Sequence, residues 1–395
     1  MRLSHYVALI AFIPAALCPT ALVAQQIRQH EKVSVNFNAQ RWHSVDNGEK
    51  SDVQFMAQEG FPGGLLALKE GSVALNDFDF TDGTIEFDIK PIGEDMPGIQ
   101  FRTQGSSETR NAEEFYIRSQ PDCRASDDCL QYAPVINGFM LWNFYPQYQT
   151  QAFVLDGWNH VRLVISGRRM NVYLNQQSQP ALSVGELEGE AHSGGIELSS
   201  PAYYANLTVT PSDTSGLSPL PLPDPTHRDL NIVRRWQLGS LTAWDRQDVK
   251  YSERPGSLNS WKPVPAERFG LVNLDRDFTN NNQPPKVAWM RTTVTSDREQ
   301  SKQVSLAWLG ETWVFVNGRL VGSGKNFYYP NEERRNPDGR LSLDNGSFTL
   351  PLQRGSNEIM VAILTDVHDD PTRPNHYGWG LGMRFDNTAG LRFER

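Results

Sequence analysis

The chain has 395 residues, of which 10% are aromatic and 21% are charged, with 31 glycines and 25 prolines. This length suits two or three domains, and the high glycine and proline content favours strands and turns over helices. The formal net charge of −9 at pH 7 argues against a nucleic-acid partner, because phosphate binding needs basic patches and the sequence has no run of cations.

Residues 1–24 are expected to form an export signal. Arg2 gives a positive start, Tyr6–Ala16 is an apolar run, and small residues precede a cleavage site after Ala24. The run is too short for a transmembrane segment, which needs roughly 20 apolar residues. Leu17 before Cys18 fits a lipid-attachment box poorly. We therefore expect a secreted protein, periplasmic or extracellular, without a transmembrane segment.

A first antiparallel β-sandwich is predicted over residues 33–210, because apolar and polar residues alternate along several short segments. In GTIEFDIKP, Ile85, Phe87 and Ile89 share one face. In GIQFRTQ and EEFYIRS, the same alternation points Arg102 and Glu114 outward.

The order of these segments resembles a known family. From DGTIEFDIKP, through DGWNHVRLVISGRRMNVYLN, to YYANLTV, it is similar to the laminin-G or concanavalin A-like jelly roll over most of residues 50–210. The resemblance implies a fold but no single activity, since this fold hosts lectins, hydrolases and adhesion modules.

Cys123 and Cys129 are the two cysteines that remain after cleavage of the signal. An even number of cysteines in an exported chain predicts a disulfide, and the alternative is two free thiols. The ring they close is short, so its entropic contribution is below the roughly 3 kcal/mol of a 15-residue loop.

Residues 211–228, PSDTSGLSPLPLPDPTHR, are predicted to be a Pro-rich linker. Their proline, serine and aspartate content buries little apolar surface, and proline favours a stiff, extended chain.

Residues 229–395 are predicted to form a second β-sandwich. In TWVFVNGRLVG, Asn317-Gly318 accepts the positive φ angles of a type I′ hairpin between two strands. This segment, followed by FTLPLQRGSNEIMVAIL, resembles the galactose-binding-like jelly roll that accompanies many glycosidases. The predicted fold class is therefore all-β, with two jelly-roll sandwiches.

Polar and aromatic residues of the first sandwich are predicted to line a carbohydrate-binding face. Arginine, glutamate and amide groups hydrogen-bond to sugar hydroxyls, and aromatic rings cover the C–H faces. The residues are Arg102, Glu114, Tyr116, Arg118, Gln131, Asn137 and Trp142. The alternative is an Arg–Glu network on the sheet, with the tryptophan in the core.

Loop aromatics of the second sandwich form a second candidate carbohydrate surface, because loops at one end of a sandwich often bind ligands. They are Tyr328, Tyr329, Tyr377 and Trp379. The alternative is that these rings pack over the open end of the barrel.

No catalytic residues are predicted. Hydrolases of the concanavalin A-like fold often carry three acids on one strand, and Glu86 and Asp88 match two of them. Lys90 and Pro91 stand where the third acid would be. The first domain also resembles secreted bacterial domains that include hydrolases of 3-keto-glycosides. On that resemblance Glu86, Asp88 and Glu114 would be the acids, with Arg102 stabilising charge.

No metal site is predicted. The histidines do not fall at metal-binding spacing. Asp275, Asp277 and Asn280–Asn282 offer oxygen ligands of the kind that calcium prefers, but their spacing matches no defined calcium loop. No cofactor is predicted, and a structural calcium ion is the alternative.

The sequence favours a non-catalytic, secreted protein that binds a carbohydrate polymer. Each module would offer one weak site, and the linker would let both engage the polymer. The alternatives are a secreted glycoside hydrolase and an adhesion or structural protein. The sequence does not determine the oligomeric state.

Overall fold

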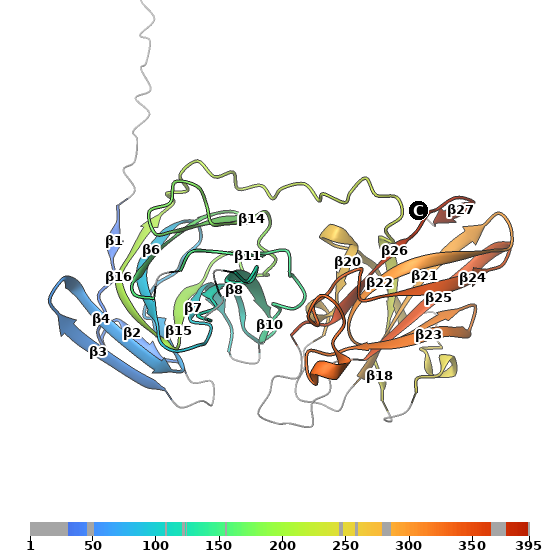
Figure 1. Cartoon of the computed structure of the whole chain (residues 1–395), viewed down its shortest axis with the longest axis horizontal. Coiled ribbons are helices and arrows are strands. Elements are labelled where there is room, and N and C mark those ends of the chain that lie inside the picture. The colour runs from blue at the N-terminus through green and yellow to red at the C-terminus, as the bar shows by residue number, and fades with distance from the viewer. Residues whose placement is uncertain are drawn as a thin grey trace, which may run out of the picture.

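The computed structural model describes residues 31–45, 51–106, 109–120, 123, 125–154, 156–244, 248–256, 260–278, 286–364 and 377–393. Their regular structure is almost entirely antiparallel strand, and the helices among them are short 3₁₀ turns (Figure 1). The prediction of an all-β fold is confirmed. None of the described helices is long and apolar enough to span a membrane. The expected export signal and Asn280–Asn282 lie outside the described residues.

The first sheet uses strands from residues 33–211. Its order is β14-β13-β12-β6-β16-β4-β3, with β1 paired to β16. The strands are β1 (Val33–Ser34), β3 (Asp52–Gln58), β4 (Phe61–Glu70), β6 (Gly83–Pro91), β12 (Asn159–Ser166), β13 (Arg169–Leu174), β14 (Leu182–Val184) and β16 (Ala202–Pro211).

The second sheet is made from the same half of the chain. Its order is β10-β9-β8-β7-β15-β5-β2, with β11 paired to β9. The strands are β2 (Trp42–Ser44), β5 (Ser72–Leu75), β7 (Gly98–Gln104), β8 (Asn111–Ile117), β9 (Leu130–Ile136), β10 (Phe139–Met140), β11 (Gln149–Thr150) and β15 (Gly195–Ser199).

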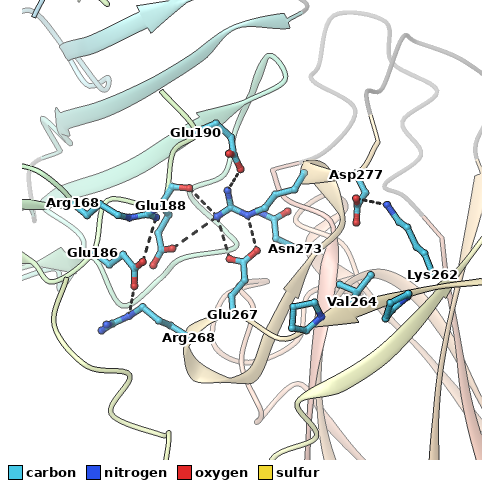
Figure 2. Close-up of a pocket in the computed structure, with 13 residues that line it drawn as sticks. Arg168, Glu186, Glu188, Glu190, Lys262, Val264, Glu267, Arg268, Asn273 and Asp277 are labelled. Atoms are coloured by element: carbon cyan, nitrogen blue, oxygen red, sulfur yellow. Dashed lines mark hydrogen bonds and ion pairs between the residues drawn. The ribbon is translucent and has the colours of Figure 1, made fainter. Parts of the chain in front are cut away.

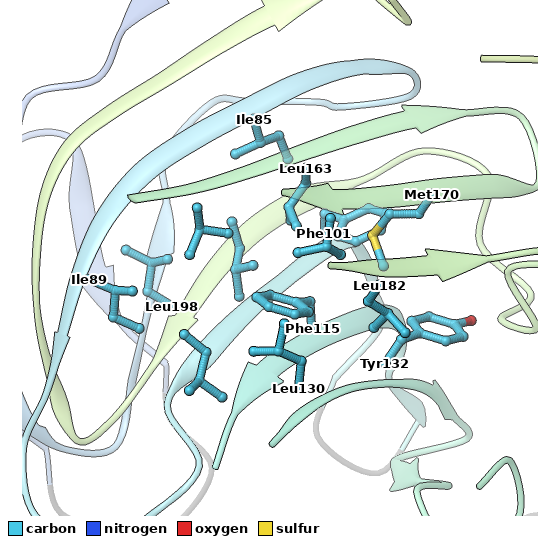
Figure 3. Close-up of a cluster of buried hydrophobic side chains, with 14 of the residues drawn as sticks. Ile85, Ile89, Phe101, Phe115, Leu130, Tyr132, Leu163, Met170, Leu182 and Leu198 are labelled. Carbon is cyan, nitrogen blue, oxygen red and sulfur yellow. The ribbon is translucent and has the colours of Figure 1, made fainter. Parts of the chain in front are cut away.

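The two sheets enclose an apolar core. Figure 3 shows Ile85 and Leu163 of the first sheet together with Phe101 and Phe115 of the second. Each of these side chains is at most 1% exposed. Alternation along a strand places successive side chains on opposite faces, so the inward residues of both sheets meet in one layer. The predicted inward face of β6 is confirmed.

Arg102 does not follow the predicted alternation. Its φ is +56°, and the pairing of β7 with β8 shifts register between Phe101 and Gln104. This irregularity turns the guanidinium away from the outer face, where it becomes 98% buried. Arg102 donates to Thr81 O at 2.9 Å and to Asp82 at 2.8 Å.

A third, eleven-stranded sheet uses strands from residues 235–393. Its main order is β19-β17-β21-β25-β22-β26-β20. The strands are β17 (Arg235–Gly239), β18 (Thr242–Ala243), β19 (Trp261–Pro265), β20 (Leu271–Asn273), β21 (Lys286–Ser296), β22 (Gln300–Val316), β23 (Arg319–Asn326), β24 (Gly346–Leu352), β25 (Gly355–Leu364), β26 (Gly380–Phe385) and β27 (Leu391–Phe393).

The long strand β22 lets this sheet fold around its own core. Its first half pairs with β24 and β26, and its second half pairs with β23 and β25. Strand β22 then turns into β23 at Asn317-Gly318, whose φ angles are +51° and +82°. The predicted Asn-Gly hairpin is confirmed.

The two halves of the chain are packed together. One apolar cluster contains residues of the first sandwich together with Leu271, Ala307, Leu309 and Leu341 of the second half. Residues 211–228 run as a strap alongside both halves (Figure 1). Leu222 N donates to Gly185 O at 2.9 Å on one side, and Arg234 pairs with Asp224 at 3.0 Å on the other. The strap therefore joins docked halves.

The disulfide predicted between Cys123 and Cys129 is present. Both cysteines are buried at the edge of the first apolar cluster. The disulfide closes the loop that leads into β9, close to the junction between the halves.

Candidate functional site

The aromatic residues predicted to bind sugar come together at the junction between the halves. Trp142 of the first half packs on Tyr328 and Tyr377 of the second, with ring centroids 4.8 and 5.0 Å apart. Trp142 is 5% exposed, and Tyr116 beneath it is fully buried. Trp142 and Tyr116 therefore do not lie on an open carbohydrate-binding face, because the second half covers this part of the sheet.

Arg118 and Gln131 support the same contact from below. Gln131 Oε1 accepts from Tyr116 OH at 2.7 Å and from Arg118 at 2.9 Å, and Gln131 Nε2 donates to Trp142 O at 3.0 Å. The Arg118 guanidinium lies 5.1 Å from the Trp142 ring. These polar groups bond to one another and hold the tryptophan in place.

Glu114 and Asn137 have separate partners. Glu114 accepts from Gln100 at 3.0 Å and does not pair with Arg102. Burial, with a smaller effect from the nearby Glu197 carboxylate, raises the pKa of Glu114 to about 7. Asn137 Nδ2 donates across the junction to Asp275 O at 2.7 Å. The Arg–Glu network expected as the alternative is therefore absent between Arg102 and Glu114.

The loop aromatics of the second half divide into two groups. Trp379 is 3% exposed and packs on Phe278 in the core of the third sheet. Tyr328 and Tyr329 are half-buried, and Arg334 lies 3.8 Å from the Tyr328 ring. Most of these rings therefore pack within the protein, as in the alternative interpretation of the loops.

Glu86 and Asp88 enclose a histidine on the outer face of the first sheet. His160 Nδ1 lies 2.7 Å from Asp88, and Lys32 bonds to Glu86 at 2.7 Å. The hydrogen bond from His160 lowers the pKa of Glu86 to about 2, and that with Asp88 raises the pKa of His160 to about 9. The two acids therefore stabilise a charged imidazolium.

Asp275 and Asp277, the two described residues suggested for calcium, have other partners. Asp275 accepts from Trp379 N at 2.7 Å, and Asp277 pairs with Lys262. Across the described part of the chain, no group of three or more His, Cys, Asp or Glu side chains is placed to hold a metal.

A pocket of about 520 Å³ lies where the two halves meet (Figure 2). Its walls combine carboxylates, cations and a short apolar strip. The lining residues are Arg168, Glu186, Glu188 and Glu190 from the first half, and Lys262, Pro263, Val264, Pro265, Glu267, Arg268, Asn273, Arg276 and Asp277 from the second.

Arg276 is the central cation of this pocket. Its Nε donates to Glu267 at 2.6 Å, and its Nη2 donates to Glu188 O at 2.8 Å. Its Nη1 pairs with Glu190 (Figure 2). One guanidinium thus connects the Gly185–Glu190 loop of the first half to the segment that follows β19 in the second.

The other cations of the pocket are also paired. Arg168 and Arg268 each approach Glu186 at 3.3 Å, and Lys262 pairs with Asp277. Charges of both signs therefore neutralise one another around the cavity.

Glu188 is the most buried acid of the pocket, at 3% exposure. Tyr148 OH donates to its Oε1 at 2.7 Å, while Arg276 stays 4.0 Å from its Oε2. Burial raises the pKa of Glu188 to about 8, against the opposing hydrogen bond from Tyr148. The raised pKa favours the protonated form of this carboxyl at neutral pH, the form that can donate a proton.

Of the residues that line this pocket, the sequence pointed only to Asp277, as a calcium ligand. Glu186, Glu188 and Glu190 stand at every second position in VGELEGEAH, which is a detectable signal. Their partners in the second half, Arg268 and Arg276, lie more than 80 residues further along the chain. Only the docking of the halves brings these groups together.

No protein-family model matches the chain, and no curated protein matches it. Several solved structures are similar to part of it. A carbohydrate-binding module of Bacillus subtilis is 13% identical, covers 42% of this chain and 94% of its own, and has a TM-score of 0.30. A B. subtilis protein with a galectin-like fold is 15% identical, with coverages of 46% and 94% and a TM-score of 0.33. A Bacillus licheniformis β-glucanase is 12% identical, with coverages of 47% and 100% and a TM-score of 0.32.

Proposed function

We propose that this chain is an exported carbohydrate-binding protein and that the pocket between its halves holds the sugar. The observation that carries the proposal is the internal pairing of the pocket's charges. Arg276, Arg268 and Lys262 each contact a carboxylate of the same cavity. A charged ligand would have to compete with these pairs, whereas a neutral polyol can bond to their remaining lone pairs and N–H groups.

The size and the apolar strip of the pocket support the same ligand class. A volume of about 520 Å³ lies within the roughly 300–1,000 Å³ of small-molecule sites. Pro263, Val264 and Pro265 of the edge strand β19 supply an apolar wall. Such a wall suits the C–H face of a pyranose ring, while the opposite carboxylates accept hydrogen bonds from its hydroxyls.

Calorimetric titration of the mature protein with a panel of neutral oligosaccharides tests this proposal. Glu190 and Lys262 lie at the rim, each about half exposed. We expect the double variant Glu190→Gln/Lys262→Gln to fold normally and to bind about tenfold more weakly, as for the loss of one charge-assisted hydrogen bond.

The matched control is Glu59→Gln/Lys69→Gln, which changes two exposed residues of β3–β4 outside the pocket. This control should bind as the unmodified protein does. Equal affinity in both double variants, or no binding of any oligosaccharide, would count against the proposal. A stoichiometric protein partner in place of a sugar would favour an adhesion role.

Hydrolysis of a glycosidic bond is the second candidate function, and Glu188 favours it. A buried, protonated carboxyl in a pocket is suited to general acid catalysis. Glu188 would give its proton to the glycosidic oxygen as the C1–O bond breaks. Water would add to C1 and lose its proton to a carboxylate, Glu190 or Glu267. Turnover of model glycosides that disappears in Glu188→Gln while binding remains would support it, and inactivity across the panel would exclude it from this role.

A further inference from the structure

A second cavity, the outer pocket, lies on the third sheet. Its volume is about 430 Å³, and its polar lining is Arg235, Gln237, Arg291, Thr292 and Thr293. It shares the strip Pro263–Pro265 of β19 with the interdomain pocket. The two cavities are therefore neighbours on one edge strand.

Strand register builds the outer pocket. Gln237 of β17 pairs with Pro263 of β19 on one side and with Arg291 of β21 on the other. Arg235, two residues before Gln237, faces the same way because side chains alternate along a strand. The floor of the pocket is thus a regular three-stranded surface.

The chemistry of this lining differs from that of the interdomain pocket. It contains two arginines and no carboxylate. Arg235 is exposed, and within the described part of the chain its side chain has no hydrogen bond or ion pair. In a chain with a net charge of −9, a cavity with only positive charges in its walls is selective for anions.

Arg291 is held in position for a ligand. Its Nε donates to Gln237 Oε1 at 2.7 Å, and its guanidinium lies 4.2 Å from the centroid of the Trp261 ring. Its Nη1 lies 3.9 Å from the carboxylate of Glu358, which also accepts a hydrogen bond from Tyr251 OH. The fixed, planar guanidinium can therefore offer its terminal N–H groups with little loss of side-chain entropy.

We propose that the outer pocket binds an oxyanion carried by an acidic saccharide, either a uronic-acid carboxylate or a sulfate ester. Both anions match the planar, two-donor edge of arginine, and the threonine hydroxyls and the amide of Gln237 add neutral hydrogen-bonding groups. The saccharide part of this proposal rests on the proposed function. The anion site itself does not, since it is separate from the paired charges around Arg276.

The test is calorimetric titration of the mature protein with three probes: a galacturonic acid oligomer, a sulfated galactan oligosaccharide and a neutral glucose oligomer. We expect one or both anionic probes to bind. Comparing the affinities of the galacturonic acid oligomer and the sulfated galactan shows whether the pocket prefers a carboxylate or a sulfate. Arg235→Gln/Arg291→Gln should weaken this binding by about tenfold or more. Raising NaCl to about 0.5 M should weaken it as well, because salt screens exposed charges.

Two further variants control for folding and for charge. Arg235→Gln changes an exposed side chain that has no partner in the described chain, so this variant should fold normally and should bind anions more weakly than the unmodified protein. Arg354→Gln removes the same charge from an exposed position outside the cavity and should leave anion binding unchanged. The proposal is overturned if neither anionic probe binds, or if both arginine variants bind as the unmodified protein does.

The neutral probe separates this proposal from the proposed function. Its binding should respond to Glu190→Gln/Lys262→Gln and not to the arginine variants. If only the anionic probes bind, the proposed sugar site is contradicted and the anion site is supported. If only the neutral probe binds, the anion site is contradicted and the proposed sugar site is supported.

Discussion

The indole of Trp142 meets the phenol ring of Tyr328 edge to face, with 4.8 Å between the ring centroids and 85° between the planes. The two residues come from opposite halves of the chain, and Tyr377 packs on the same indole. An aromatic contact of this geometry stabilises beyond the area that it buries. The junction is thus a packed interface with its own small core.

Removing the Trp142 indole should weaken this interface strongly. We expect Trp142→Ala to lower the free energy of unfolding by about 3–5 kcal/mol, the usual cost of deleting a large buried aromatic side chain. Urea denaturation measures the loss. Trp158→Ala, at a partly exposed tryptophan that packs on Phe61, should cost clearly less. A loss below about 1 kcal/mol for Trp142→Ala would contradict a packed interface.

Gly378 permits the close approach of the two halves. Its φ is +131°, and a Cβ atom there would lie 2.7 Å from Cβ of Phe144 in the other half. We expect Gly378→Ala to destabilise the protein by about 1–3 kcal/mol, because the clash forces the junction apart. Calorimetry should show a lower Tm. Gly256→Ala, where a new Cβ would meet nothing within 4 Å, is the control and should leave the Tm close to its original value.

His160 should give stability that depends on pH. Its hydrogen bonds with Asp88 and Glu86 raise its pKa from 6.5 to about 9. The stabilisation is therefore complete below pH 6.5 and is lost as the pH rises through about 9. The side chain is 42% exposed, so solvent screens the effect.

His160→Gln should consequently lower stability at pH 6 and have little effect at pH 10. Urea denaturation at both pH values measures this difference, and NMR titration of His160 gives its pKa directly. His192→Gln, at an exposed histidine, is the control and should leave the stability at pH 6 unchanged. An NMR pKa for His160 near 6.5 would contradict the cluster.

Glu114 should make the protein less stable as the pH rises, whereas an acid in a surface ion pair makes a protein more stable. Burial raises its pKa from 4.5 to about 7, so the unfolded chain loses this proton at lower pH than the folded chain does. The contribution of Glu114 to the free energy of unfolding therefore falls by about 1–3 kcal/mol as the pH rises from 4.5 to 7.

Glu114→Gln keeps an acceptor for Gln100 and removes the ionisable group. We expect the variant to be more stable than the original protein at pH 8, with a smaller difference at pH 5. Chemical denaturation across this range measures the difference, and Glu59→Gln serves as an exposed control. A difference that does not change with pH would show that Glu114 ionises normally.

Local periodicity and local backbone preferences were enough to predict several features of the fold. Alternation along β6 identified Ile85 and Phe87 as core residues, and both are fully buried. Asn317-Gly318 identified a hairpin, because few residue pairs accept two positive φ angles. Two cysteines six positions apart identified the disulfide.

Which segment covers each face of a sheet depends on contacts between distant parts of the chain. Alternation along β8 predicts that the Tyr116 side chain points away from the sandwich core. It does not predict that the second half of the chain then buries this side chain. A register shift in β7 reversed the orientation expected for Arg102. The pocket brings Arg276 next to Glu188 and Glu190, about 90 residues earlier in the chain, and no local pattern determines that these residues meet. Such contacts form when the surfaces of the two folded halves dock. This docking depends on the shape and charge of both halves, and not on any local stretch of sequence.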